Sequence, residues 1–234
     1  MFYIYRERVK RSRLAEYEAS THDLLRLLRD APFADEIRFT AVAGPELGYA
    51  YVTRIAGFAG LDGFQRYLLS CLEDSGELEA WRALEARSGE TVEHAAAYVV
   101  QLRPDLSYLP ERVRLDGELP YRLYRWYFVR PGHQEAVEEL VQRAAELCGR
   151  RGISHGWRVY RVLLGEELPS YVVVERAASK ADSARARARV SAAVGADIEA
   201  LAREVRPHVR RVDVMDGLVR ADLSFPPAAR GYEL

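Results

Sequence analysis

Ionisable side chains stand inside apolar stretches in the second half of this 234-residue sequence. Arg125 lies in YRLYRWYFV, Arg158 in WRVYRVLLG and Glu175 in SYVVVERA. A buried charge is costly unless it is paired or faces a wet cavity. Two interpretations follow. In one, an inward-pointing arginine beside Tyr160 binds an anionic or enolate-like group; in the other, the arginines reach the strand edges and form salt bridges.

Aromatic residues are abundant, with 14 Tyr, 7 Phe and 3 Trp. Tyr127, Trp157 and Tyr160 fall in the same apolar stretches as the arginines. Such residues indicate either an ordinary core, in which each hydroxyl finds a partner, or a pocket for a flat apolar ligand. In the second case tyrosine hydroxyls would orient or protonate the ligand.

The common catalytic and metal-binding motifs do not occur in the sequence. It contains no GxGxxG, P-loop, HExxH or GxSxG and no paired Cys/His spacing. The net charge of −1 provides no field that would attract nucleic acid or anionic lipid. Cys71 and Cys148 are expected to be reduced thiols on helices, and the N-terminus resembles neither a signal peptide nor a membrane span. We expect a cytoplasmic protein without nucleic-acid or membrane partners.

The elements that must position these residues follow the order β-α-β-β-α-β in the second half. YRLYRWYFV predicts a strand, and Pro131-Gly132 turns the chain into an amphipathic helix. WRVYRVLLG and SYVVVERA predict a hairpin around Gly165. A helical region from about Ser179 to Val205, interrupted near Gly195, precedes a last strand. This order is that of a ferredoxin-like unit, with both helices on one face of four antiparallel strands.

The same patterns occur twice along the chain. RPDLSYLP at 103–110 matches RADLSFPP at 220–227, and three further landmarks match in the same order at offsets of 120 or 121. The sequence therefore predicts a tandem duplication: a first repeat at 1–110, a linker at 111–119, a second repeat at 120–225 and a tail at 226–234. Asp105 and Ser107, like Asp222 and Ser224, are expected to cap a turn after the last strand of each repeat.

The strands predicted for each repeat carry apolar residues on both faces. Leu123 and Tyr127 alternate with Tyr124 and Trp126 along one strand. The helices cover only one face of the sheet. Each large apolar side chain left exposed on the other face would lose the roughly 1.5–3 kcal/mol of stabilising free energy that its burial provides. A second sheet packed against the other face is the simplest cover. The predicted fold is therefore α+β, with two ferredoxin-like repeats whose antiparallel sheets pack into an intramolecular α/β barrel.

The strand at 121–129, the turn Pro131-Gly132-His133 and the helix EAVEEL resemble the opening of members of the dimeric α/β-barrel superfamily, including its NIPSNAP-like and antibiotic-biosynthesis-monooxygenase-like branches. The resemblance covers about 2–107 and 121–224 as two copies. It implies a barrel of two ferredoxin-like units. Members include cofactor-free oxygenases, haem-binding proteins and isomerases, so the resemblance leaves the function open.

Haem binding, one function that the resemblance allows, would need an axial ligand such as histidine. His94, beside three small alanines, and His155, beside Trp157 and a flexible Gly156, are the better candidates among five histidines. Both can equally be structural residues, one at a strand end and one in a loop. We expect no cofactor, with haem as the exception that these two residues permit.

The function predicted from these observations is the binding of a small aromatic or flat apolar molecule between the sheets, with cofactor-free oxygenase chemistry as the activity that the resemblance implies. Two alternatives remain: a non-catalytic binding or self-assembly module that associates through outer helices or the tail, and a haem protein. The second repeat is the first place to look for the site. Its candidate ligand-binding residues, with one from the first repeat, are Arg158, Tyr160, Arg125, Tyr127, Trp157, His155 and His94.

Overall fold

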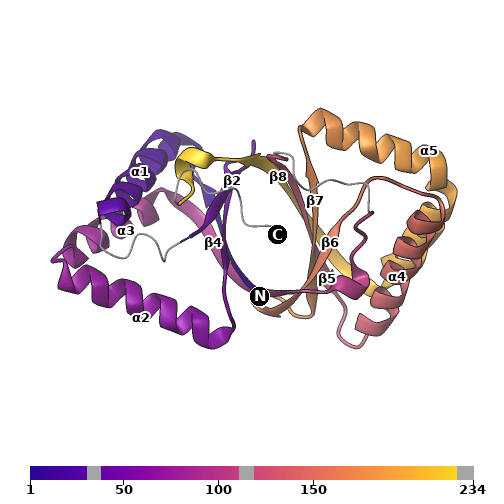
Figure 1. Cartoon of the computed structure of the whole chain (residues 1–234), viewed down its shortest axis with the longest axis horizontal. Helices are drawn as coiled ribbons and strands as arrows, with labels where there is room; N and C mark the ends of the chain where they lie inside the picture. The colour runs from indigo at the N-terminus through magenta and orange to yellow at the C-terminus, as the bar shows by residue number, and fades with distance from the viewer. Residues whose placement is uncertain (31–37, 111–118, 226–234) are drawn as a thin grey trace. The chain divides into compact units, whose positions relative to one another are not determined.

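The computed structural model describes residues 1–30, 38–110 and 119–225 (Figure 1). The elements of the first half are β1 (Phe2–Val9), η1 (Arg11–Arg13), α1 (Leu14–Asp30), β2 (Thr40–Ala43), β3 (Gly48–Arg54), α2 (Phe58–Asp74), α3 (Leu78–Thr91), β4 (Val92–Leu102) and η2 (Pro104–Leu106). Those of the second half are β5 (Tyr121–Val129), α4 (Gln134–Arg150), β6 (Arg158–Leu164), β7 (Ser170–Ala177), α5 (Lys180–Val205), η3 (Arg206–His208), β8 (Val209–Val219) and η4 (Ala221–Leu223).

The eight strands follow the order β1-β3-β2-β8-β5-β7-β6-β4 in a closed barrel. The fold is thus α+β, as predicted. The chain divides into two compact units. Unit 1 contains Met1–Val99 and the segment that begins at Val219, and unit 2 contains Val100–Leu218.

Unit 2 has the predicted element order. β5 pairs with β7 on one side and with β8 on the other, and β7 also pairs with β6. The prediction that β5 is apolar on both faces is confirmed, because Leu123 and Tyr127 alternate with Tyr124 and Trp126 and three of the four are buried. Two helices, α4 and α5, lie on one face of this sheet (Figure 1).

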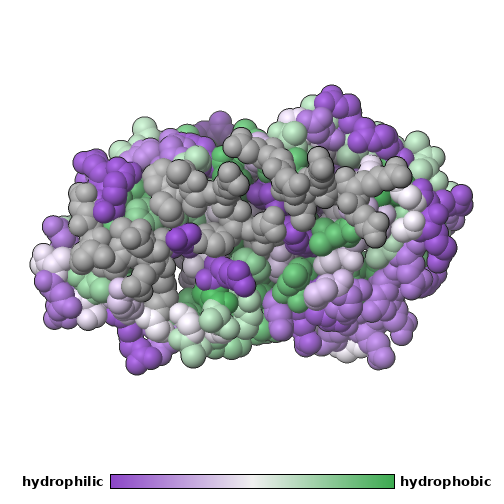
Figure 2. Space-filling model, in the orientation of Figure 1, coloured by the Kyte–Doolittle hydropathy of each residue, from purple (hydrophilic) through white to green (hydrophobic). Residues whose placement is uncertain are grey.

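Both helices of unit 2 are amphipathic. Val137, Leu140 and Cys148 of α4 are buried, while its outer side is charged, and the outward surfaces of α4 and α5 are largely hydrophilic (Figure 2). Ser179 caps α5 by accepting a hydrogen bond from the backbone N–H of Asp182 at 3.0 Å. The predicted interruption near Gly195 is confirmed, since Val194 has non-helical backbone angles.

Unit 1 pairs β1 with β3 and β3 with β2. Its sequence predicts one helix between β3 and β4, but two are present, α2 and α3. The physical reason is Gly76, whose φ of 77° lies in the left-handed region that ends helices. The backbone N–H groups of Ser75 and Gly76 donate to the last carbonyls of α2.

The repeated DLS motifs form the short helices η2 and η4, each directly after the last strand of its half. Ser107 Oγ donates to the Arg103 carbonyl at 2.7 Å and accepts from the Val159 N–H at 2.9 Å. Ser224 Oγ makes the matching bonds to the Arg220 carbonyl and the Ala41 N–H, also at 2.7 and 2.9 Å. The predicted turn-capping role of both serines is confirmed. The η2 motif follows the sequence of unit 1 but belongs to unit 2. The η4 motif follows the sequence of unit 2 but belongs to unit 1.

Three further predictions concern the rest of the chain. Cys71 and Cys148 are free thiols on α2 and α4, as expected. Within the described ranges, none of the helices combines the length and apolar character needed to cross a bilayer. Nearly all of the predicted linker, residues 111–118, and the whole tail at 226–234 lie outside the described residues, and the repeat boundaries stay predictions.

Candidate functional site

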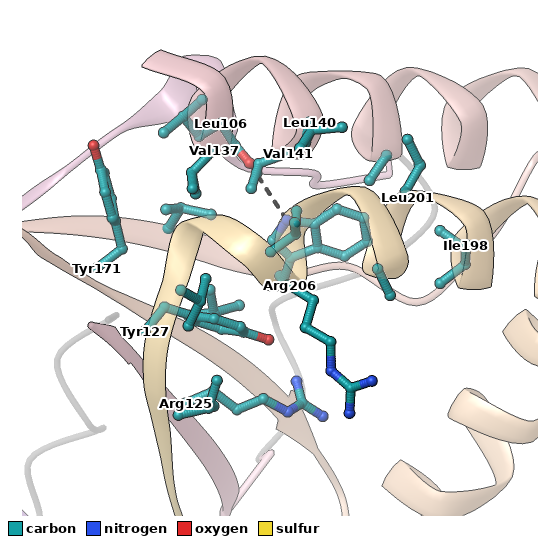
Figure 3. Close-up of a pocket in the computed structure, with 18 of the residues that line it drawn as sticks. Leu106, Arg125, Tyr127, Val137, Leu140, Val141, Tyr171, Ile198, Leu201 and Arg206 are labelled. Atoms are coloured by element: carbon teal, nitrogen blue, oxygen red, sulfur yellow. Dashed lines mark hydrogen bonds between the residues drawn. The ribbon is translucent and has the colours of Figure 1, made fainter. Parts of the chain in front are cut away.

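A cavity of about 720 Å³ lies in unit 2 between the helices and the sheet (Figure 3). Its walls are apolar side chains of the two helices: Val137, Leu140 and Val141 from α4, and Ile198, Leu201 and Val205 from α5. The strands supply aromatic side chains, Tyr127 and Tyr171, and Trp157 precedes β6. The volume falls in the range of cavities that hold small organic molecules.

Strand alternation decides which predicted residues reach this cavity. Arg125 and Tyr127, two residues apart on β5, both face the helices and line it. On β6 the cavity receives Val159, so Arg158 and Tyr160 lie on the opposite face of the sheet, where they are 8% and 0% exposed. The seven predicted ligand-binding residues therefore do not form one site.

Four of the seven do lie together, since Trp157 and His155 line the same cavity as Arg125 and Tyr127. His94 is an exposed residue of β4 in unit 1, outside the cavity. The expected location also differs. The sequence predicts a site between two sheets, whereas this cavity lies between a sheet and its helices.

The charged end of the cavity consists of Arg125, His155 and Glu175. Glu175, on β7, forms an ion pair with Arg125, and its other oxygen, Oε2, lies 2.8 Å from His155 Nε2. Burial alone would raise the pKa of the Glu175 carboxyl. The hydrogen bond with His155 and the charge of Arg125 outweigh burial and hold that pKa below its usual range.

An ionised Glu175 fixes the orientation of the His155 ring. With Nε2–H donating to the carboxylate, Nδ1 is the nitrogen that can accept a proton. A histidine held in this way by a carboxylate is an arrangement suited to a general base. The charged end can thus remove a proton from a weakly acidic ligand bound against the apolar walls.

The segment that carries His155 and Trp157 is held in place by its packing. Trp157 Nε1 donates to the Leu106 carbonyl at 3.3 Å, and its ring centroid lies 5.2 Å from that of Tyr108. A Cβ added to Gly156 would lie 2.5 Å from the Tyr108 carbonyl oxygen. Glycine at this position therefore permits a close approach of two backbone segments, and the flexibility expected of Gly156 stays a prediction.

A second polar cluster adjoins the apolar part of the cavity. Arg103 binds both oxygens of Glu138, at 2.6 and 2.8 Å, and also pairs with Asp105, while the Tyr171 hydroxyl donates to Glu138. The hydrogen bond from Arg103 is the main reason that the pKa of Glu138 is lowered. Sequence reasoning missed this cluster, although the repeated R-x-D-x-S spacing marked Arg103 and Asp105. It assigned Asp105 only to a turn cap, whereas the carboxylate also pairs with Arg103.

Unit 1 contains a matching cluster. Arg220 pairs with Asp222 at 2.7 Å and with Glu18 at 2.7 Å, and the Tyr49 hydroxyl donates to Glu18 at 2.8 Å. The residues correspond to those of unit 2 at offsets of 117 for Arg and Asp, 120 for Glu and 122 for Tyr.

Tyr17 of unit 1 stands 120 positions before Val137, a wall residue of the cavity. Its hydroxyl contacts Glu7 at 2.5 Å and the Tyr51 hydroxyl at 2.6 Å. Burial raises the pKa of the Glu7 carboxyl despite the hydrogen bonds that it accepts from Tyr17 and Tyr5. At this position a buried polar side chain in unit 1 replaces the small apolar one in unit 2.

The remaining histidines lie elsewhere. His22, on α1, is 3.8 Å from Asp222. His133 directly precedes α4, and its Nδ1 contacts Nδ1 of His208 at 2.7 Å. His208 is therefore a half-buried contact residue. Across residues 1–30, 38–110 and 119–225, no cluster of three or more His, Cys, Asp or Glu side chains could hold a metal ion.

This chain is similar to known proteins in its structure but not in its sequence. No family model matches the sequence, and no curated protein matches it closely enough to count as a relative. An anthrone oxidase-like protein of known structure superimposes with a TM-score of 0.64 at 15% identity, over 93% of this chain and 90% of that chain.

Two further structures show the same fold. A protein named as a candidate monooxygenase from Fusobacterium nucleatum subsp. nucleatum has a TM-score of 0.51 at 12% identity, over 93% of this chain and 91% of its own. A variant chlorite dismutase from Candidatus Nitrospira defluvii has a TM-score of 0.52 at 12% identity, over 93% and 90%. At such low identity these likenesses show the fold alone. This chain therefore shares its α/β-barrel fold with these three proteins.

Proposed function

We propose that unit 2 binds a flat, largely apolar small molecule in the cavity between its helices and its sheet. The observation that carries this proposal is the combination of a cavity of about 720 Å³ with a charged end in which His155 is held by Glu175. Trp157, Tyr127 and Tyr171 would contact the rings of such a ligand.

The chemistry that fits this arrangement is proton removal followed by reaction with dioxygen. His155 would accept a proton from an acidic C–H or O–H group through Nδ1, and Arg125 would stabilise the anion that remains. For a ring methylene the balanced outcome is R₂CH₂ + O₂ → R₂C=O + H₂O. In this overall reaction the ligand is oxidised and dioxygen is reduced. The names of two fold neighbours, an anthrone oxidase-like protein and a candidate monooxygenase, support oxidation of this type.

Haem is the alternative ligand. An iron axial ligand needs an available imidazole nitrogen. Because Nε2 of His155 contacts Glu175 at 2.8 Å, Nδ1 is the nitrogen that His155 would offer. His94 is exposed on β4 and does not line the cavity. Of the two candidate histidines, only His155 would therefore serve a haem in this cavity.

We propose further that the two halves descend from one duplicated ferredoxin-like unit. The matched serine bonds of η2 and η4 and the matched clusters around Glu138 and Glu18 support this origin. A duplicated chain can keep a site in one half only. The replacement of Val137 by Tyr17 at the corresponding position is in line with a site that persists in unit 2.

Oxygen uptake tests the activity, and native mass spectrometry tests binding. Anthrone is a suitable first probe because its ring methylene is acidic and its body is flat. We expect uptake by the wild-type chain, loss of uptake in His155→Gln, and unchanged uptake in Arg143→Gln, which alters an exposed residue of α4. A native mass increased by that of bound anthrone, without oxygen uptake, would favour a non-catalytic binding module. Absence of both would contradict the proposal and leave self-association as the remaining alternative.

A further inference from the structure

The cavity of unit 2 carries more positive charge than its acidic residues neutralise. Of the arginines that line it, Arg125 pairs with Glu175, and Arg210 and Arg211 both approach Glu167. Burial would raise the pKa of the Asp216 carboxyl, but hydrogen bonds from Lys180 and Tyr121, with a smaller effect of the Arg187 charge, lower it. Asp216 is thus an acidic neighbour of Arg187.

Arg206 is different from these arginines. Arg206 is solvent-exposed and lines the cavity, and within the described parts of the chain its guanidinium group has neither a hydrogen-bond acceptor nor an acidic partner. Figure 3 shows the guanidinium groups of Arg206 and Arg125 extending to the same end of the cavity, with the Tyr127 ring above them. Among the acidic lining residues, Glu138 is already bound by Arg103 and Tyr171, and Glu199 is exposed on α5.

The backbone that carries Arg206 is anchored. Arg206 begins η3, and the next two residues are held by Arg130, which directly follows β5: the Arg130 side chain donates to the Pro207 carbonyl at 2.9 Å, and the Arg130 N–H donates to the His208 carbonyl at 2.8 Å. His133 contacts the His208 ring from the same side. A guanidinium on a fixed backbone, without an internal acceptor, loses less conformational freedom when it binds an external anion.

We propose that the ligand of this cavity is an aromatic carboxylate, with its rings against the apolar walls and its carboxylate bound by Arg206. The inference rests on the proposed function, because it concerns the same cavity, and adds the chemical class of the ligand. The planar fork of arginine donors matches the two oxygens of a carboxylate. Arg125 adds positive charge at the same end, although Glu175 already occupies part of its donor set.

A matched pair of fluorescent probes tests this class. 9-Anthracenecarboxylate and 9-anthracenemethanol share one ring system, and only the first is an anion near neutral pH. We expect the wild-type chain to bind the carboxylate roughly ten- to a hundredfold more tightly, the range for a hydrogen bond to a charged group. Arg206→Gln should reduce this preference to near unity, and Arg206→Lys should retain part of it.

Arg203→Gln is the control, since Arg203 is an exposed residue one turn earlier on α5 and does not line the cavity. It should keep the preference for the carboxylate. Equal binding of both probes by the wild type would overturn the inference. A preference for the carboxylate that survives in Arg206→Gln would overturn it too. Both results would leave the cavity proposal intact. Binding of neither probe would contradict the proposed function itself. Circular dichroism of each variant verifies that the fold is kept.

Discussion

His133 and His208 face each other with their Nδ1 atoms 2.7 Å apart. At this distance one ring must donate and the other must accept, so the contact needs one nitrogen without a proton. The pair joins the start of α4 to η3, directly after α5, and these are the two helices that wall the cavity.

We predict that this histidine contact stabilises the junction between α4 and η3. His208→Ala should destabilise the chain by about 1 kcal/mol, the usual net value of one hydrogen bond. Chemical denaturation of the wild type and the variant at the same pH measures the difference. Equal stability of the two proteins would show that the pair has no such role.

Glu175→Gln should destabilise the chain by about 3 kcal/mol, because it leaves Arg125 only 20% exposed and without its acidic partner. In the wild type the pKa of Glu175 is lowered, so its contribution is present above the pKa of an unfolded glutamate and is lost as pH falls through the folded value. Urea titrations of both proteins at neutral and acid pH measure this difference, which should shrink in acid. A constant difference would contradict the ion pair.

The matched arginines give a test within one molecule. Arg103→Ala and Arg220→Ala each remove an arginine that bridges two carboxylates, and the two residues are 22% and 31% exposed. We predict similar destabilisation, about 1–3 kcal/mol in each case. Only Arg103→Ala should also weaken binding of anthrone, because Glu138 lines the cavity. Equal effects of the two variants on binding, measured by native mass spectrometry, would count against a site in unit 2.

Gly156→Ala should cost more than about 2 kcal/mol, since the new Cβ would meet the Tyr108 carbonyl at 2.5 Å and Pro110 Cδ at 2.8 Å. The control is Gly63→Ala on α2, where nothing lies within 4 Å of the added Cβ. Alanine favours a helix over glycine by about 1 kcal/mol, so this variant should be slightly more stable than the wild type. Chemical denaturation measures both. A mild effect at Gly156 would show that the 155–157 segment can move.

Local patterns in the sequence determined the elements of the second half. The aromatic and β-branched stretch 121–129 is β5, and the interruption near Gly195 is found at Val194, because strand alternation, helical periodicity and turn residues act over a few positions. The same is true of Ser107 and Ser224, whose capping bonds to the Arg103 and Arg220 carbonyls span four residues.

The tertiary structure alone decided which of these residues meet. Helical cover on one side of the sheet directs Arg125 and Tyr127 into the cavity and Arg158 and Tyr160 to the other face, a choice that alternation by itself leaves open. His155 meets Glu175 across 20 positions. Arg206 lines the cavity from η3, whose Pro207 accepts a hydrogen bond from Arg130, 77 positions earlier in the chain. Contacts between segments distant in the chain depend on how the elements pack, and residue spacing carries no direct record of that packing.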